Sequence, residues 1–351
     1  MTAVQLIGHG GTEKLFYNER VPVPIAKPGE VLLKVLAAGI NNTDINTRIG
    51  WYSSSAMAST ADTTNTNIAP TDGDWTGTGL AFPRIQGADV CGEIVSVGLG
   101  VSSNRIGERV IVQSCLLSLK QGEFTPWLGS ERDGGFAQFV AVPSADTYHI
   151  QSELTFAQLA AVPCAFATAE NLLSRAHLQV GETVLITGAS GNVGIAAIQL
   201  AKRRGCTVIA IAAAEKFSEL QSAGASQCVG RDSALTTILG SNCIDVVIDV
   251  VGGPQRTQLL DVLKPRGRYA VSGAIAGPIV QMDLRKLYLK DLTLFGCTSQ
   301  DASVFPNLVG YIERGEISPI VAKQYPMQDI AIAQEEFLSK KHFGKIVLIP
   351  P

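Results

Sequence analysis

The pattern of hydrophobic and polar positions changes near residue 150. Before that point, short apolar runs alternate with glycines and other turn residues, which predicts a β-rich first part. Its expected strands cover residues 31–36, 90–98, 109–113 and 136–142. After that point, apolar β-branched runs are separated by helical segments of about 10–15 residues, which predicts a parallel, doubly wound sheet. The fold class expected is therefore α/β.

The second part predicts strands and helices in alternation. Residues 154–173 are expected to form one or two helices, with a break at Pro163. The later strands cover 184–187, 207–212, 246–250, 267–272 and 292–296, and helices cover 193–203, 215–223 and 254–263. A last helix over 329–339 precedes a strand over 345–349, which we expect to return to the first part. This predicts a discontinuous domain, 1–152 with 322–351, and a second domain, 153–321.

A glycine-rich turn joins the strand 184–187 to the helix 193–203. Small residues there let the backbone approach a pyrophosphate, and the N–H groups and positive dipole end of the helix favour an anion. The strand before and the helix after make this pattern far more specific than three glycines alone. We therefore predict a dinucleotide site lined by Gly188, Ala189, Ser190, Gly191, Asn192, Val193 and Gly194.

Composition narrows the possible partners. The chain has 351 residues, 46% of them hydrophobic and 17% charged, with a net charge of −3, which fits a compact enzyme of about two domains. The absence of long basic runs argues against nucleic acid and anionic membranes as targets, and no uninterrupted apolar stretch is long enough to span a bilayer. The seven cysteines are scattered without a C-x-x-C pair, and the N-terminus does not look like a signal peptide, so we expect reduced thiols and a cytoplasmic location.

Four stretches together resemble the medium-chain dehydrogenase/reductase superfamily, and within it the zinc-independent quinone oxidoreductase branch. They are AGINNTD at 38–44, GADVCGEIVSVG at 87–98, GASGNVG at 188–194 and HFGKIVL at 342–348. The resemblance covers essentially the whole chain. It implies a GroES-like β-rich catalytic domain and a Rossmann nucleotide-binding domain. It also implies a homodimer formed through an edge strand such as 292–296.

The resemblance allows the zinc ligands to be checked one by one. The zinc alcohol dehydrogenases of this superfamily have a cysteine where this chain has Asn41 and a histidine where it has Ala88. Only Cys164 matches a ligand, and a catalytic zinc needs about three protein ligands. The region matching the structural-zinc lobe, 115–134, contains one cysteine instead of four. We therefore expect no metal.

Without a Lewis acid, the expected acceptor is a quinone or an α,β-unsaturated carbonyl, which spreads the developing charge. Asn41 takes the place of the lost zinc ligand, and Tyr52 matches a pocket tyrosine of the branch, so both are catalytic candidates. Tyr52 could donate a proton or be only a wall of the pocket. Thr168 matches a threonine near the nicotinamide. Asp44 and Arg48 are interpreted as a structural pair at i, i+4.

Two cations suggest which dinucleotide binds. No acid stands at 211–214, where an NAD enzyme usually holds the ribose, whereas Lys216 and Arg231 match phosphate-side positions of NADP-dependent relatives. Both cations could instead be solvated surface charges. We expect NADPH. The resemblance also places the nicotinamide half near four further residues: Val251, Gly273, Ala274 and Lys345.

The sequence therefore predicts an NADPH-dependent oxidoreductase that transfers hydride to a quinone or enone without zinc. Two alternatives stay open: a non-enzymatic NADPH-binding protein related to lens crystallins, and an alcohol or aldehyde dehydrogenase of the same superfamily. The partner expected is a small-molecule substrate. The segment 53–80, rich in Ser, Thr, Ala and Asn, is interpreted as a lid or specificity loop, or as a segment without a role.

Overall fold

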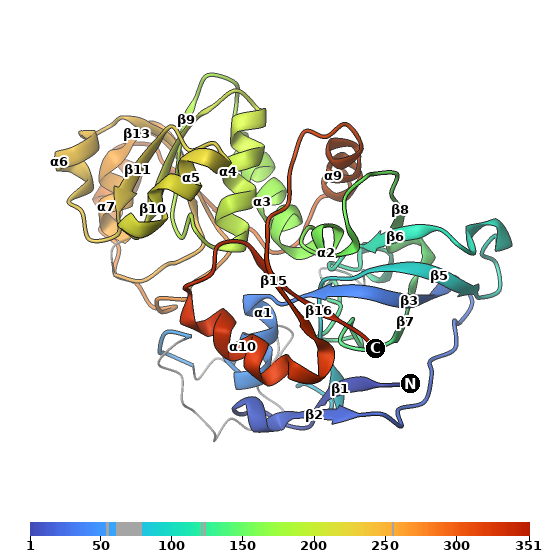
Figure 1. Ribbon diagram of the computed structural model, residues 1–351. Coiled ribbons are helices and arrows are strands. Elements are labelled where there is room, and N and C mark those ends of the chain that lie inside the picture. The colour runs from blue at the N-terminus through green and yellow to red at the C-terminus, as the bar shows by residue number, and fades with distance from the viewer. Residues whose placement is uncertain (54–55, 61–78, 121, 123, 255) are drawn as a thin grey trace.

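The computed structural model describes residues 1–351 apart from 54–55, 61–78, 121, 123 and 255. Most of the segment 53–80, interpreted above as a loop, therefore lies outside the described residues. The described chain contains two large sheets, one at each end of the molecule, and the helices α2 and α3 lie between them (Figure 1).

The nucleotide-domain sheet has six parallel strands in the order β11-β10-β9-β12-β13-β14. These strands are β9 (Thr183–Ile186), β10 (Thr207–Ala212), β11 (Gln227–Gly230), β12 (Ile244–Asp249), β13 (Leu263–Val271) and β14 (Thr293–Gly296). The strand order reverses between β9 and β12, where doubly wound folds bind their ligands. The predicted Rossmann-type sheet is confirmed.

Helices precede and separate these strands, in the alternation that the sequence predicts, and one more follows β14. They are α3 (Pro163–Arg175), α4 (Asn192–Arg203), α5 (Phe217–Ala223), α6 (Leu235–Leu239), α7 (Arg256–Val262), α8 (Leu284–Tyr288) and α9 (Val304–Glu313). The helix α4 has its buried residues at helical spacing, with Ile195, Ile198 and Leu200 facing the core. This apolar stripe attaches the glycine turn firmly to the sheet.

The second large sheet is built mainly from the first part of the chain, with strand order β15-β16-β3-β5-β6-β8 and with β7 paired to β3. Its strands are β3 (Glu30–Gly39), β5 (Cys91–Val97), β6 (Arg109–Val112), β7 (Phe139–Pro143), β8 (Thr147–His149), β15 (Val321–Pro326) and β16 (Lys345–Ile349). A small sheet adds β1 (Ala3–Leu6), β2 (Leu15–Asn18) and β4 (Arg84–Ile85). The short helix α1 (Asn42–Ile49) follows β3.

The end of the chain returns to this sheet, as predicted. The strand β16 pairs antiparallel with β3, with Val347 opposite Gly39, and α10 (Ile330–Ser339) contacts β16. The strand β15 begins at Val321, one residue before the boundary expected at 322. The exact domain boundaries at 152/153 and 321/322 remain a prediction.

Between the sheets, Pro163 separates α2 (Phe156–Leu159) from α3, as expected. Phe156–Arg175 is long and apolar enough to span a bilayer by length and composition, although polar residues interrupt it. The fold explains this apolar character, because 83% of an 18-residue stretch within the segment is buried inside the protein. Its hydrophobicity therefore serves the core of the molecule.

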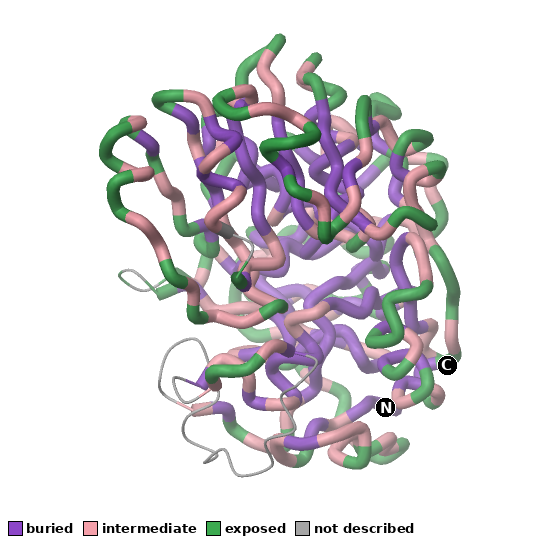
Figure 2. The backbone as a smooth tube through the Cα atoms, turned by 90° about the vertical axis from the view of Figure 1, so that its left-hand side faces the viewer, coloured by how far each residue is buried: buried purple, intermediate pink, exposed green. Residues whose placement is uncertain are grey.

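One buried cluster joins the two sheets. It contains Ala37 and Cys91 from the first sheet, Phe166 and Leu172 from α3, and Ile186 from β9. Figure 2 shows the buried backbone running continuously through the middle of the molecule. Burial of apolar surface across this junction favours a fixed arrangement of the two sheets. The site between them is consequently supported from both sides.

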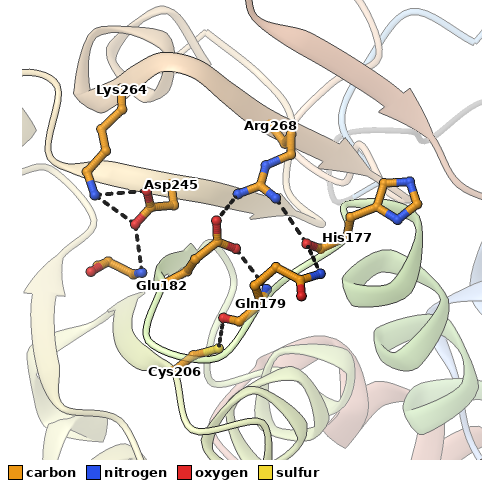
Figure 3. A network of polar contacts seen from close by, with 8 residues as sticks. His177, Gln179, Glu182, Cys206, Asp245, Lys264 and Arg268 are labelled. Carbon is orange, nitrogen blue, oxygen red and sulfur yellow. Dashed lines mark hydrogen bonds and ion pairs between the residues drawn. The ribbon is translucent and has the colours of Figure 1, made fainter.

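The amino ends of β9, β12 and β13 are tied together by a polar network (Figure 3). Lys264 Nζ lies 2.8 Å from Asp245 Oδ1, and Arg268 contacts Glu182 at 2.5 Å. Asp245 also accepts a hydrogen bond from the backbone N–H of Thr183. These contacts lie at the edge formed by the amino ends of the strands. The glycine turn lies at the opposite edge, which the carboxyl ends of the strands form.

Candidate active site

The carboxyl ends of β9, β12 and β13 are joined by one buried carboxylate. Asp249, 1% exposed, accepts a hydrogen bond from Thr187 Oγ1 at 2.5 Å and another from the hydroxyl of Tyr269. The backbone N–H groups of Val251 and Gly252 donate to Asp249 Oδ1 at 2.9 and 3.1 Å. Sequence reasoning missed this anchor, although an acid ending an apolar strand was a visible signal.

The glycine turn follows β9 and shapes the start of α4. Gly188 has φ +56°, and a Cβ on Gly194 would lie 2.4 Å from the carbonyl oxygen of Gly188. Gly191 is the N-cap of α4 and provides no side-chain cap among the described contacts, so the first N–H groups of the helix keep their capacity for an external acceptor. These features fit a dinucleotide pyrophosphate.

Two loops, one after β12 and one after β13, lie at the same edge of the sheet as the glycine turn. A Cβ on Gly188 would be 2.9 Å from Val251 Cγ2, and a Cβ on Gly273 would be 2.7 Å from the carbonyl oxygen of Val250. The backbone N–H of Ala276 donates to the carbonyl of Val251 at 2.9 Å. The structure thus places the predicted cofactor residues of this edge together: Gly188, Ala189, Ser190, Gly191, Asn192, Val193, Gly194, Val251, Gly273 and Ala274.

The predicted phosphate-side cations lie at the ends of neighbouring strands. Ala212 of β10 pairs with Gly230 of β11, and Lys216 and Arg231 follow these two residues along the chain. Arg231 is exposed, whereas the side chain of Lys216 is 14% exposed and its ammonium donates to the carbonyl of Lys341 at 2.7 Å. Sequence reasoning missed that the segment 340–342 reaches this place.

A buried polar triangle forms around Asn41, the residue expected in place of a zinc ligand. Lys345 Nζ lies 2.5 Å from Asp89 Oδ2 and 2.5 Å from Asn41 Oδ1, and Asn41 Nδ2 donates to Asp89 Oδ2 at 2.9 Å. The side chains of Lys345 and Asp89 are 1% and 0% exposed. Lys345, expected to line the cofactor, thus directs its ammonium toward Asp89 and Asn41, a pairing that sequence reasoning missed.

Cys164 belongs to the same buried cluster. Its backbone N–H donates to Asp89 Oδ1 at 2.6 Å, and Thr168 follows one turn further along α3. Burial raises the pKa of the Cys164 thiol, and the charge of Asp89 raises it further. Within the described residues, no group of three or more His, Cys, Asp or Glu side chains is arranged to hold a metal ion.

The interpretation of Asp44 and Arg48 as a pair is wrong. Asp44 instead accepts hydrogen bonds from the backbone N–H groups of Asn41 at 2.8 Å and Gly87 at 3.2 Å, and Arg48 donates to Gln334 at 2.9 Å. A carboxylate in the first turn of a helix satisfies N–H groups that have no helical partner, and this local demand decides its direction. Burial raises the pKa of Asp44 to about 7.

Tyr52 lies just beyond the end of α1, half-buried, with its hydroxyl 3.3 Å from Thr43 Oγ1. The rings of Tyr52 and Trp51 meet edge to face, with centroids 5.6 Å apart. Burial raises the pKa of the Tyr52 hydroxyl. The group therefore stays protonated at neutral pH and is able to donate a hydrogen bond.

A doubly wound nucleotide sheet beside a β-rich domain, with a glycine turn and a polar cluster between them, defines a two-domain oxidoreductase that uses a nicotinamide cofactor. The family described as "Alcohol dehydrogenase GroES-like domain" matches residues 27–152, and the family described as "Zinc-binding dehydrogenase" matches residues 192–314. The chain belongs to the medium-chain dehydrogenase/reductase superfamily.

Individual relatives have different names. A quinone oxidoreductase of Rattus norvegicus is 28% identical, over 99% of this chain and 98% of its own. A structure from Sinorhizobium meliloti 1021, provisionally described as an alcohol dehydrogenase, is 44% identical, covers 100% of this chain and 97% of its own, and has a TM-score of 0.91. A cobalt- and zinc-bound alcohol dehydrogenase from Pyrobaculum aerophilum is 30% identical, covers 100% and 99%, and has a TM-score of 0.84.

Proposed function

We propose that this protein is an NADPH-dependent reductase of quinones or α,β-unsaturated carbonyls that works without zinc. The observation that carries the proposal is the triangle of Asn41, Asp89 and Lys345. An amide and an ammonium ion are poor zinc ligands, and a buried ammonium ion repels a second cation. Asn41 and Lys345 therefore favour a site without zinc, at the place where the resemblance puts the metal of the zinc enzymes.

The residues around this position suggest how the reaction would proceed. Bound NADPH would supply a hydride, so two electrons and one hydrogen pass to the acceptor, and one added proton completes a hydroquinone or a saturated carbonyl. Tyr52 would donate a hydrogen bond to the acceptor oxygen as negative charge develops on it. The two hydrogens of Asn41 Nδ2 already face Asp89 and, at 3.4 Å, the carbonyl of Gly39. Asn41 would therefore donate to the substrate only with the hydrogen that faces the carbonyl of Gly39, because that bond is the weaker of the two.

The cofactor preference rests on Lys216 and Arg231. Both follow the ends of adjacent strands, at the edge where the adenosine ribose lies in doubly wound folds. Glu219 Oε1 lies 3.8 Å from Lys216 Nζ, which is too long for a hydrogen bond, so the ammonium keeps donors with which to bind a phosphate. We therefore propose a 2′-phosphate site formed by these two cations.

An acceptor panel tests the proposed function. Loss of NADPH absorbance would be followed with simple quinones, enones, saturated ketones and aldehydes, and repeated with NADH. The proposal expects turnover with quinones or enones and a preference for NADPH. Turnover confined to saturated carbonyls would favour an alcohol dehydrogenase, the candidate suggested by the 44% and 30% identical structures. Tight NADPH binding with no turnover of any acceptor would favour the non-enzymatic, crystallin-like alternative.

We also propose a cytoplasmic homodimer. Each of the seven cysteines, all within the described residues, is free, as expected in a reducing compartment. In the described part of the chain, β14 pairs with β13 alone, so one edge of the sheet is open. Near this edge, Leu284, Tyr288 and Leu289 are 64%, 62% and 72% exposed. An open strand beside exposed apolar side chains suits a second copy of the chain.

A further inference from the structure

The orientation of the Asn41 amide is fixed by two charged neighbours. Lys345 Nζ carries only donors and lies 2.5 Å from Asn41 Oδ1, so this end of the amide has to be the oxygen. Asp89 Oδ2, as a carboxylate oxygen, only accepts, and it lies 2.9 Å from Asn41 Nδ2. Turning the amide over would place two donors face to face at one end and two acceptors at the other.

Asp89 is itself held by a third element. Its other oxygen, Oδ1, accepts the backbone N–H of Cys164 at 2.6 Å, in the first turn of α3. Its Oδ2 meets Lys345 Nζ at 2.5 Å, and both side chains are almost completely buried. A carboxylate bonded through both oxygens has little freedom to turn. The direction of the Asn41 amide is therefore set jointly by β16, which carries Lys345, and by the start of α3.

This arrangement leaves one hydrogen of the amide for a ligand. One hydrogen of Asn41 Nδ2 is used by Asp89, and the other faces the carbonyl oxygen of Gly39 at 3.4 Å, which is long for a hydrogen bond. The ammonium of Lys345 draws electron density toward the amide oxygen, so the N–H groups of the same amide become better donors. The weakly bonded hydrogen is consequently both oriented and strengthened.

We propose that Lys345 is a positioning residue for the reaction: its ammonium fixes and polarises the Asn41 amide, so that an N–H, and not the amide oxygen, meets the oxygen of the acceptor. Asn41 then stabilises the negative charge that develops on this oxygen as the hydride arrives. The inference rests on the proposed function, because it assigns a role in that same reaction. Lys345 forms and breaks no covalent bond.

A double substitution should turn the amide over without leaving a buried charge. In Lys345→Gln with Asp89→Asn, residue 89 keeps its oxygen on the N–H of Cys164 and presents its NH₂ group to Asn41, whose oxygen then has to face it. We expect kcat with a quinone to fall about five- to tenfold, the effect of one lost hydrogen bond, with KM for NADPH unchanged. A higher KM for NADPH with kcat retained would make Lys345 a cofactor contact and overturn the proposal.

A distant ion pair offers a matched control. Lys264 Nζ lies 2.8 Å from Asp245 Oδ1 at the opposite edge of the nucleotide-domain sheet. Lys264→Gln with Asp245→Asn makes the same chemical change there, and we expect it to leave kcat unchanged. Equal losses of kcat in the two double variants would show a general effect on the structure and overturn the proposal.

Asn41→Ala tests the same idea without disturbing the buried ion pair. It should lower kcat by a similar factor, and an unchanged kcat would overturn the proposal. In this background, Lys345→Gln with Asp89→Asn should cost nothing further, because the amide through which Lys345 acts is gone. Additive losses would contradict the inference.

A coloured phenol gives a readout that needs no turnover. The probe p-nitrophenol resembles a hydroquinone, and its colour shows what fraction is ionised. Bound to the NADP⁺ complex, it should ionise at a lower pH in the wild-type protein than in the Lys345→Gln, Asp89→Asn variant, because the oriented N–H stabilises the phenolate. The same ionisation in both proteins would overturn the positioning role. A wild-type protein that shows the difference but reduces no quinone would end the proposed function alone.

Discussion

At the residue scale, the notable feature is a buried ammonium ion, that of Lys345, beside Asn41 and Asp89. Lys345 is neutralised by Asp89 and hydrogen-bonded to Asn41, and Gly39 makes room for it, since a Cβ there would lie 2.4 Å from Lys345 Cε. A buried charge without its partner is strongly destabilising, so these residues depend on one another. Their first role is to hold β16 against β3 beside the site.

The residue-scale prediction for the reaction concerns Tyr52. Tyr52→Phe removes the hydroxyl but keeps the ring that contacts Trp51. If the hydroxyl donates a hydrogen bond to the acceptor oxygen, kcat with quinones should fall about 10- to 100-fold, at or below the lower limit for full proton transfer. Steady-state kinetics with NADPH would measure this, and an unchanged kcat would make Tyr52 a wall of the pocket.

Asp44 predicts a pH dependence of stability. Its pKa is about 7 in the folded protein against an ordinary value of 3.8, so the folded state keeps a proton that the unfolded chain releases. The free energy of unfolding should therefore fall as the pH rises between these two values, by on the order of a few kcal/mol at most. Asp44→Asn should flatten this dependence in urea titrations, whereas parallel pH profiles for the two proteins would contradict the assignment.

At the element scale, the turn between β9 and α4 combines two different demands on glycine. Gly194 is needed for packing, because a Cβ there would press against the carbonyl oxygen of Gly188. Gly191 is exposed at the N-cap, where an added Cβ would have no atom nearer than 3.3 Å. One glycine thus supports the fold and the other leaves space for a ligand.

These two glycines predict a separation of effects. Gly194→Ala should destabilise the protein by about 1–3 kcal/mol, the usual cost of overpacking. Gly191→Ala should leave the melting temperature nearly unchanged but weaken NADPH binding, because the methyl group would project toward the pyrophosphate. Thermal unfolding and fluorescence titration would measure both, and normal NADPH affinity in Gly191→Ala would argue against a cofactor at this turn.

The ends of β10 and β11 predict the cofactor preference. Lys216→Ala should weaken NADPH binding about 10- to 100-fold, as expected for a lost charged hydrogen bond, while NADH binding stays the same. Lys202→Ala, on the neighbouring helix α4, is a matched control that removes a cation without touching the proposed phosphate site. Parallel losses for both dinucleotides would show that Lys216 has no phosphate-specific role.

Local sequence signals predicted most of the elements but few of the contacts between them. Apolar spacing and glycines are signals confined to a few neighbouring residues. They were therefore sufficient to predict β9, the glycine turn and α4 from the sequence. Asp89 and Lys345 are 256 positions apart, and nothing local indicates that they meet. Asp44 was misassigned because helical spacing suggested Arg48, while the unpaired N–H groups of the helix start were the stronger demand.

At the scale of the whole molecule, the two sheets share one buried core, and the proposed site lies at their junction. The open edge at β14 predicts a dimer. Light scattering should give twice the mass of 37.1 kDa, and Leu284→Glu with Leu289→Glu should yield monomers, since both side chains are exposed in the single chain. Leu99→Glu, at a more exposed position in the first domain, is the control. A monomeric wild-type protein would contradict this prediction.

The central claim is hydride transfer to a conjugated acceptor at a site without metal. The most direct test measures quinone reduction by NADPH together with the metal content of the same purified protein, before and after treatment with a chelator. We expect full turnover at far less than one zinc per chain and no change after chelation. Stoichiometric zinc, with activity lost on its removal and regained on its return, would contradict it.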